Sequence, residues 1–230
     1  MTSLLVAEYT VLALGITSFA VYIATRPRRM AEKRSVAMRA AAEKLGFEYH
    51  EQAPEALVER LDGLRPFEYC RSMRFTNVMR GSSEFGETTV FDAQHLVAGG
   101  RHTQGMSMRS FACHFPQSVV FPAFRLTPLS AFRRAGRLLG EPGIDLELHP
   151  QFSRQYLLQG EDVEGIRARF TPPVIELLEV RPGLQVQADG NVLFVRLERS
   201  GARSAEIVEG VETARRLFAL LVESYRRRAV

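Results

Sequence analysis

Histidine and cysteine are the residues of this chain most able to bind a metal, so their spacing comes first. Metal sites in proteins recur with short spacings such as HxH, HxxxH, HExxH or CxxC. The two cysteines, Cys70 and Cys113, are far apart, and no two histidines have such a spacing. The sequence therefore predicts no metal site and no cofactor. The five histidines are His50, His95, His102, His114 and His149.

Asp92 and His95 form the best candidate pair for acid–base catalysis, with His102 beyond the Gly99-Gly100 turn. A carboxylate that orients an imidazole is a common arrangement in general-base catalysis. Residues three apart on a strand, however, point to opposite faces of the sheet. The sequence also lacks G-x-S-x-G and the glycine-rich phosphate loops. No catalytic residue is therefore assigned, and an enzyme of unrecognised type remains an alternative.

The first 25 residues determine where any such chemistry would take place. Residues 3–25 contain a single charged side chain, Glu8. As a helix, this stretch would be ~34 Å long, against ~30 Å for the hydrocarbon core of a bilayer. A cleavable signal peptide would have Lys or Arg before the apolar run, and an interfacial helix would have a polar face. The sequence shows neither, so residues 1–25 are predicted to be a transmembrane anchor.

A basic segment, residues 26–35, follows the predicted anchor and is interpreted as a juxtamembrane linker. No Lys or Arg precedes the apolar run. By the positive-inside rule, the N-terminus lies outside and the rest of the chain in the cytoplasm, at the inner (plasma) membrane. The basic side chains are expected to contact anionic headgroups, each contributing about 1 kcal/mol. These membrane-surface residues are Arg26, Arg28, Arg29, Lys33 and Arg34.

Beyond the linker, residues 36–230 are predicted to form one soluble domain with almost no net charge. The whole chain carries +4, with 30 Lys and Arg against 26 Asp and Glu. Residues 1–35 hold five of the basic and two of the acidic residues, which leaves 25 against 24. Nucleic-acid binding is therefore not expected, because it needs a basic surface. Two cysteines without a framework spacing fit unpaired thiols in a reducing compartment.

Apolar periodicity and turn residues indicate how the domain is built. Ser35 is predicted to cap a helix over residues 36–45 that ends at Gly46, and Pro54 to open a helix over 55–61 with Leu57, Val58 and Leu61 on one face. Short runs rich in Phe, Val and Thr then predict an antiparallel meander. These predicted strands are residues 47–50, 75–80, 88–97, 106–115 and 119–126.

The C-terminal part alternates helices and strands. Asp189-Gly190 is predicted to turn a hairpin over residues 184–197, and Ser204 to cap a long helix over residues 205–228. One apolar stripe along this helix indicates packing on the sheet. The remaining predicted elements are helices at 128–139, 161–170 and from 172, and strands at 144–148 and 155–159.

The predicted fold class is α+β, with an N-terminal transmembrane helix, a mainly antiparallel sheet and a long C-terminal helix. A pleckstrin-homology-like arrangement, in which a meander is closed by a C-terminal helix, is one candidate for the topology.

Several stretches resemble a family of uncharacterised single-pass bacterial membrane proteins. The resemblance covers roughly residues 45–200 and implies the same plan of an N-terminal anchor and one α+β domain. It implies no activity, because its motifs consist of apolar and turn residues. They are Asn77-Val78, Gly81, Phe91-Asp92, residues 121–128, Phe152-Ser153, residues 156–162, Ile166-Arg167 and Phe170.

The sequence thus favours a membrane-tethered cytoplasmic binding or scaffolding domain without a catalytic site. Its partners would be the lipid bilayer, through residues 3–25, and a protein that the sequence does not identify. An enzyme acting at the membrane face and a peripheral sensor of anionic lipid are the two alternatives.

Overall fold

The computed structural model describes residues 28–61, 73–98, 104–117, 119–130, 143–146, 149–197 and 203–226. The predicted anchor, residues 1–25, and Arg26 lie outside these ranges. Within them, no helix is both long enough and apolar enough to cross a bilayer.

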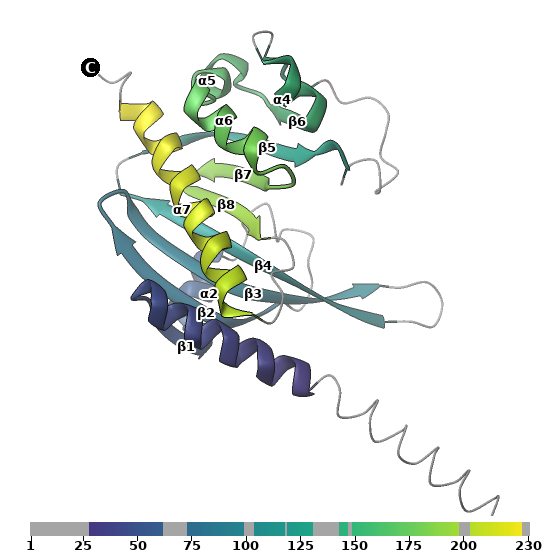
Figure 1. The fold of residues 1–230 in the computed structure, drawn as a ribbon, viewed down its shortest axis with the longest axis vertical. Coiled ribbons are helices and arrows are strands. Elements are labelled where there is room, and N and C mark those ends of the chain that lie inside the picture. Colours follow the sequence, from purple (N-terminus) through teal and green to yellow (C-terminus); the bar gives the residue numbers. More distant parts are fainter. Residues whose placement is uncertain are drawn as a thin grey trace, which may run out of the picture.

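One antiparallel sheet of eight strands organises the domain, in the order β1-β2-β3-β4-β8-β7-β5-β6 (Figure 1). The α+β class and the antiparallel sheet are therefore confirmed. The pleckstrin-homology-like topology is wrong, because β8 inserts beside β4 and separates it from β5. The strands are β1 Glu48–Gln52, β2 Arg74–Ser83, β3 Gly86–Ala98, β4 Gln104–Pro116, β5 Phe121–Pro128, β6 Tyr156–Gly160, β7 Gln185–Gly190 and β8 Val192–Leu197.

The first described helix covers residues 28–45 and begins earlier than predicted. Ser35 is not its cap but lies in its interior, so the helix runs through the boundary drawn between the linker and the domain. Its C-terminal end is as predicted: Gly46 follows with φ 67°, the left-handed conformation in which glycine commonly ends a helix. Its buried apolar residues recur at helical spacing: Ala37, Met38, Ala41 and Ala42.

Helix 28–45 and the C-terminal helix α7 (Ser204–Arg226) lie on the same face of the sheet (Figure 1). The predicted stripe of α7 is confirmed as core, since Ile207, Val211, Ala214, Phe218 and Leu221 are all buried. Together the two helices cover the larger apolar cluster of the domain.

The opposite face of the first strands is covered by the short helix α2, Glu55–Leu61. Leu57 and Leu61 pack there as predicted, but Val58 is 40% exposed and does not share their face. In β4, successive residues alternate between the two faces of the sheet. Phe111, Cys113 and Phe115 point toward α2, while Ala112 belongs to the cluster under helix 28–45 and α7.

Smaller helices cover the β5–β6 end of the sheet (Figure 1): α4 Pro150–Gln155, α5 Val163–Arg167 and α6 Pro172–Val180. The strand predicted at 144–148 is not formed over residues 143–146, although the Ile144 amide donates to the Leu158 carbonyl of β6 at 2.7 Å. Most of the helix predicted at 128–139 lies outside the described residues.

The β7–β8 hairpin is present, but it turns one residue later than predicted. Asp189 pairs with Val192, so the two loop residues are Gly190 and Asn191. Gly190 has φ 61°, and Asn191 is not among the residues with positive φ. A positive φ at the first loop residue alone is typical of a type II′ turn, which prefers glycine there. A type I′ turn, the other common two-residue hairpin turn, would have needed positive φ at both loop residues.

Candidate functional site

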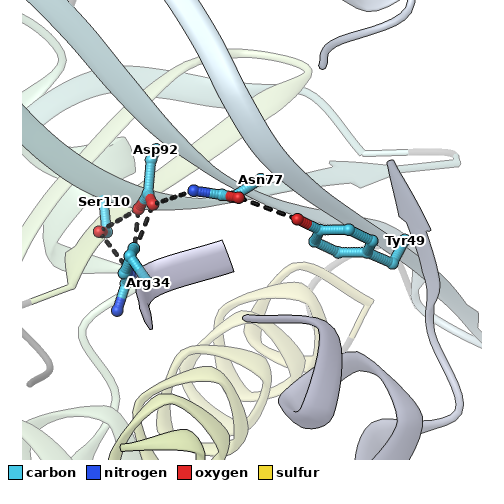
Figure 2. A network of polar contacts seen from close by, with 5 residues as sticks. All are labelled: Arg34, Tyr49, Asn77, Asp92 and Ser110. Carbon is cyan, nitrogen blue, oxygen red and sulfur yellow. Dashed lines mark hydrogen bonds and ion pairs between the residues drawn. The ribbon is translucent and has the colours of Figure 1, made fainter. Parts of the chain in front are cut away.

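A buried polar network lies between helix 28–45 and the first four strands, and Asp92 is its centre (Figure 2). Asp92 is in β3 between Phe91 and Ala93, which pack under α2. Strand alternation therefore turns its carboxylate toward helix 28–45. There it is fully buried, with 0% of the residue exposed. A carboxylate in such a position requires a counter-charge and hydrogen-bond donors.

Arg34 supplies the counter-charge from the helix. Its Nε donates to Asp92 Oδ2 and its Nη2 to Oδ1, each at 3.0 Å. This two-pronged geometry suits the planar guanidinium and the carboxylate, and it fixes their relative orientation. Arg34 Nη2 also donates to Ser110 Oγ at 2.9 Å, so the helix is bonded to β4 as well as β3.

Two side chains of the sheet complete the coordination of the carboxylate. Ser110 stands opposite Asp92 in the β3–β4 register, and its hydroxyl donates to Oδ1 at 2.5 Å. Asn77 Nδ2 donates to Oδ2 at 2.9 Å, and Tyr49 Oη donates to Asn77 Oδ1 at 2.9 Å. The network thus joins helix 28–45 to four strands, β1 to β4 (Figure 2).

A β-bulge places the Asn77 amide in this network. The β2–β3 register shifts between Thr76 and Met79, so one extra residue of β2 is accommodated there. Asn77 has φ 53°, a left-handed conformation that asparagine tolerates better than most residues.

The geometry equips this network to hold a helix in place rather than to transfer a proton. Each oxygen of Asp92 accepts two hydrogen bonds. A general base needs a lone pair directed at a substrate, and here four donors occupy that space. Removing either Arg34 or Asp92 would leave a buried charge without its partner, which typically costs about 3–5 kcal/mol.

The predicted membrane-surface residues divide into two groups. Arg28, Arg29 and Lys33 are exposed in the first turns of helix 28–45. Arg34 is 6% exposed and has its guanidinium against Asp92, so it does not present its charge to headgroups. That assignment is wrong because Arg34 belongs to the buried stripe of the helix, one turn before Ala37 and Met38. Arg26 lies outside the described residues.

The candidate pair of Asp92 and His95 gains no support. Asp92 is bonded to Arg34, Ser110 and Asn77, while His102 and the side chain of His95 lie outside what the structure describes. Among the described residues, no group of three or more His, Cys, Asp or Glu is placed to hold a metal ion. His50 pairs with Glu48 at 3.0 Å.

His114 is a second buried polar group on the same face. Its Nδ1 is 3.2 Å from Thr88 Oγ1, its Nε2 is 3.1 Å from the Phe85 carbonyl, and its ring stacks on Phe218 of α7. Because a carbonyl can only accept, Nε2 carries the proton and Nδ1 accepts from the threonine. Burial lowers the pKa of His114 to about 4, so the ring is neutral at pH 7. Burial likewise raises the pKa of the Cys113 thiol.

Two hollows flank helix 28–45 and α7. One, of about 510 Å³, lies beside the first turns of helix 28–45 and is lined by Glu32, Lys33, Val36, Ala37, Ala40 and Ser204. The other, of about 420 Å³, lies next to His114 and is lined by Ser83, Glu84, Phe85, Thr88, His114, Arg215, Arg216 and Ala219. Val36, in the first hollow, is 68% exposed.

The sequence contained signals for the polar network that its interpretation missed. Arg34 precedes Ala37, Met38, Ala41 and Ala42 at helical spacing, which places an arginine on a buried stripe. Asp92 interrupts the apolar and hydroxyl-bearing run of residues 88–93. A buried charge on each of two elements is the pattern of an ion pair between them.

Comparison with known proteins identifies a fold relative but no family. No family model matches the sequence, and no curated protein matches it. Among solved structures, the fold resembles that of the mycobacterial trehalose monomycolate transport factor A, TtfA, with a TM-score of 0.55. The match covers 82% of this chain and 94% of that one at 13% identity. At this identity the likeness shows a shared fold only.

Proposed function

We propose that this protein is a membrane-tethered binding or scaffolding domain that works without a catalytic site. The Arg34–Asp92 network carries the proposal, because it attaches the helix that follows the predicted anchor to the sheet. An anchor joined to a domain by a flexible linker would leave the domain free to rotate. An anchor that continues into a helix bonded to four strands would set the orientation of the domain relative to the bilayer.

The surface held in this way is the hollow between helix 28–45 and the start of α7. Its lining combines apolar Val36, Ala37 and Ala40 with charged Glu32 and Lys33. An apolar strip with a charged rim is the usual composition of a protein-binding surface. The similarity to TtfA, a protein named as a transport factor, is compatible with a non-enzymatic role of this kind.

Recovery of a partner from membranes tests the proposal. The full chain, tagged at its C-terminus, is extracted in mild detergent after crosslinking, and the recovered proteins are quantified. A stoichiometric partner is expected with the wild type and is expected to be lost with Val36→Glu. Val180→Glu is the matched control, because Val180 is also well exposed, at 76% against 68% for Val36, but lies on α6 away from the hollow.

Two results would contradict this function. Release of the full chain from membranes by alkaline carbonate would contradict the predicted anchor and the predicted inner-membrane location. Equal recovery of the partner with Val36→Glu and with Val180→Glu would show that the partner does not bind the hollow beside Val36.

Sensing of anionic lipid remains a second candidate, because Arg28, Arg29 and Lys33 are exposed next to the predicted anchor. Flotation of the full chain with neutral and with anionic vesicles tests it. Lipid sensing would be excluded if the wild type floats equally with neutral and with anionic vesicles and if the Arg28→Gln/Arg29→Gln/Lys33→Gln variant does the same.

A further inference from the structure

The β3–β4 ribbon extends beyond the rest of the sheet. β2 pairs with β3 as far as Arg74 opposite Gln94, and β8 pairs with β4 from Ser110 onward. β3 and β4, however, continue to pair with each other to Ala98 opposite Gln104. In the part of the chain that the structure describes, residues 95–98 and 104–107 are therefore a two-stranded ribbon. Figure 1 shows it projecting from the body of the domain.

The ribbon and the start of helix 28–45 point to the same end of the molecule. Arg34 contacts Asp92 in β3, whereas Phe47, just after the helix, packs against Gly81 at the other end of β2. The helix therefore runs opposite to β3, and its first turn extends past Asp92 toward the ribbon (Figure 1). Residue 28 lies about 9 Å beyond Arg34 along the helix, and Ala98 lies about 13 Å beyond Gln94 along the strand.

The composition of this end differs from that of an ordinary projecting hairpin. Edge strands exposed to water usually carry charges that prevent association. Residues 95–98 and 104–107 contain no Asp, Glu, Lys or Arg, and they include Leu96, Val97 and Met106. An isolated two-stranded ribbon is also only marginally stable in water. The nearby helix start supplies exposed Arg28, Arg29 and Lys33, with Met30 56% exposed among them.

We propose that the β3–β4 ribbon lies in the headgroup layer of the membrane, as a second contact beside the anchor. This inference rests on the proposed tethering. The described residues nearest the predicted anchor, in the basic first turns of helix 28–45, are at the ribbon's end of the domain (Figure 1), so a bilayer entered by the anchor would face that end. The ribbon does not cross the membrane, because open strand edges are not tolerated in hydrocarbon. It lies in the interface, where apolar side chains are buried and backbone groups stay hydrated.

Contact with the membrane through both the anchor and the ribbon would fix the orientation of the domain, which the anchor alone would not. A domain held by a single helix can tilt about it, whereas a helix and a ribbon at separate points define the plane of the membrane. Together with the Arg34–Asp92 network, the ribbon would orient the hollow beside Val36 at a constant height above the bilayer.

Tryptophan fluorescence can locate the ribbon, because the chain contains no tryptophan. Leu96→Trp and Val97→Trp are made separately in the full chain, since successive residues of a strand point to opposite faces. Each is reconstituted in nanodiscs of anionic lipid with or without brominated acyl chains. Glu84→Trp is the control, because Glu84 is exposed in the turn at the opposite end of β3.

In at least one ribbon variant, we expect brominated lipid to reduce emission to about half, because an indole at the interface lies close to the upper acyl chain. Glu84→Trp should be unchanged. If both ribbon variants match Glu84→Trp while the protein remains in the nanodisc, the ribbon proposal is overturned and the tether stands. If the protein does not enter nanodiscs at all, the anchor fails first and the ribbon proposal fails with it. Quenching that persists after Arg28, Arg29 and Lys33 are all replaced by Gln supports a contact made by the ribbon itself.

Discussion

Two buried polar sites lie side by side on β3 and β4. Each buries an ionisable side chain between the sheet and a helix, one in its charged form and the other in its neutral form. In each, one residue of β3 stands opposite one of β4: Asp92 opposite Ser110, and Thr88 opposite His114. Helix 28–45 covers the first site with an arginine, while α7 covers the second with the ring of Phe218. The first site is charged and the second is neutral. The covering helix therefore determines which protonation state the sheet can bury.

This contrast predicts that the two sites fail under different conditions. The ion pair depends on both charges being present, so it is broken by mutation. The histidine depends on the absence of charge, so it is broken by acid.

The largest effect is expected from removing one charge of the ion pair. Asp92→Leu leaves the Arg34 guanidinium buried without its carboxylate, which should lower the free energy of unfolding by about 3–5 kcal/mol. Replacing both residues, as Arg34→Met/Asp92→Leu, should recover most of that loss, because two apolar side chains need no partner. Urea unfolding of the full chain in detergent measures both.

An exposed ion pair on a helix provides the control for this comparison. Arg167 and Glu164 pair at 3.2 Å on α5, with side chains 42% and 84% exposed. Arg167→Met should change stability by less than about 0.5 kcal/mol. If the double variant at Arg34 and Asp92 is no more stable than Asp92→Leu alone, the network contributes more to the free energy of unfolding than the pairing of its two buried charges.

Acid should weaken the second site. The pKa of His114 in the folded protein is about 4, because of burial, and an unfolded histidine has a pKa near 6.5. The unfolded state therefore takes up the proton first. The contribution of His114 is fully present above pH 6.5 and is lost as the pH falls toward 4. Between pH 7 and pH 5 the loss should be roughly 2 kcal/mol.

The His114→Gln variant isolates this term. Glutamine does not titrate. Between pH 7 and pH 5, the free energy of unfolding of His114→Gln should therefore fall by about 2 kcal/mol less than that of the wild type. Arg215 near the ring opposes its protonation, and Glu84 lines the adjacent hollow. Equal pH dependence in the wild type and in His114→Gln would show that His114 is readily protonated in the folded state.

The bulge at Asn77 is expected to have a smaller, conformational effect. Both Asn77→Gly and Asn77→Ala remove the hydrogen bonds to Asp92 and Tyr49, but only glycine accepts φ 53° without strain. Asn77→Ala should therefore be less stable than Asn77→Gly by about 1 kcal/mol. Thermal unfolding of the two variants side by side measures the difference. Equal stabilities would indicate that the bulge relaxes when the amide is lost.

Local patterns predicted the elements of this fold more successfully than their connections. Gly46 ended its helix, Pro54 opened α2, and the stripe of α7 packed on the sheet, because each depends on neighbouring residues only. The insertion of β8 beside β4 was not predictable in the same way. It depends on apolar faces meeting across some 80 residues of chain, and strand alternation does not specify which strands pair.

The candidate site shows the same limit more sharply. The sequence suggests His95 as the partner of Asp92, because the two residues are close along the chain. The partners of Asp92 in the structure, Arg34, Asn77 and Ser110, are 58, 15 and 18 residues away. Arg34 in turn was grouped with the neighbouring basic residues, although its position on the apolar stripe distinguishes it from Lys33. Charge was interpreted by proximity along the chain, whereas burial depends on the face of the helix.

A similarly small effect should come from Tyr49, the outermost member of the network. Tyr49 donates to Asn77, and burial raises the pKa of its hydroxyl, so it remains a donor at neutral and moderately alkaline pH. Tyr49→Phe removes one neutral hydrogen bond and should lower the free energy of unfolding by about 1 kcal/mol. In the Asn77→Gly background the same change should cost much less, since the acceptor is already gone. An equal cost in both backgrounds, measured by urea unfolding, would separate Tyr49 from the Arg34–Asp92 network and place its role in packing beneath Arg39, whose guanidinium lies 5.2 Å from the tyrosine ring.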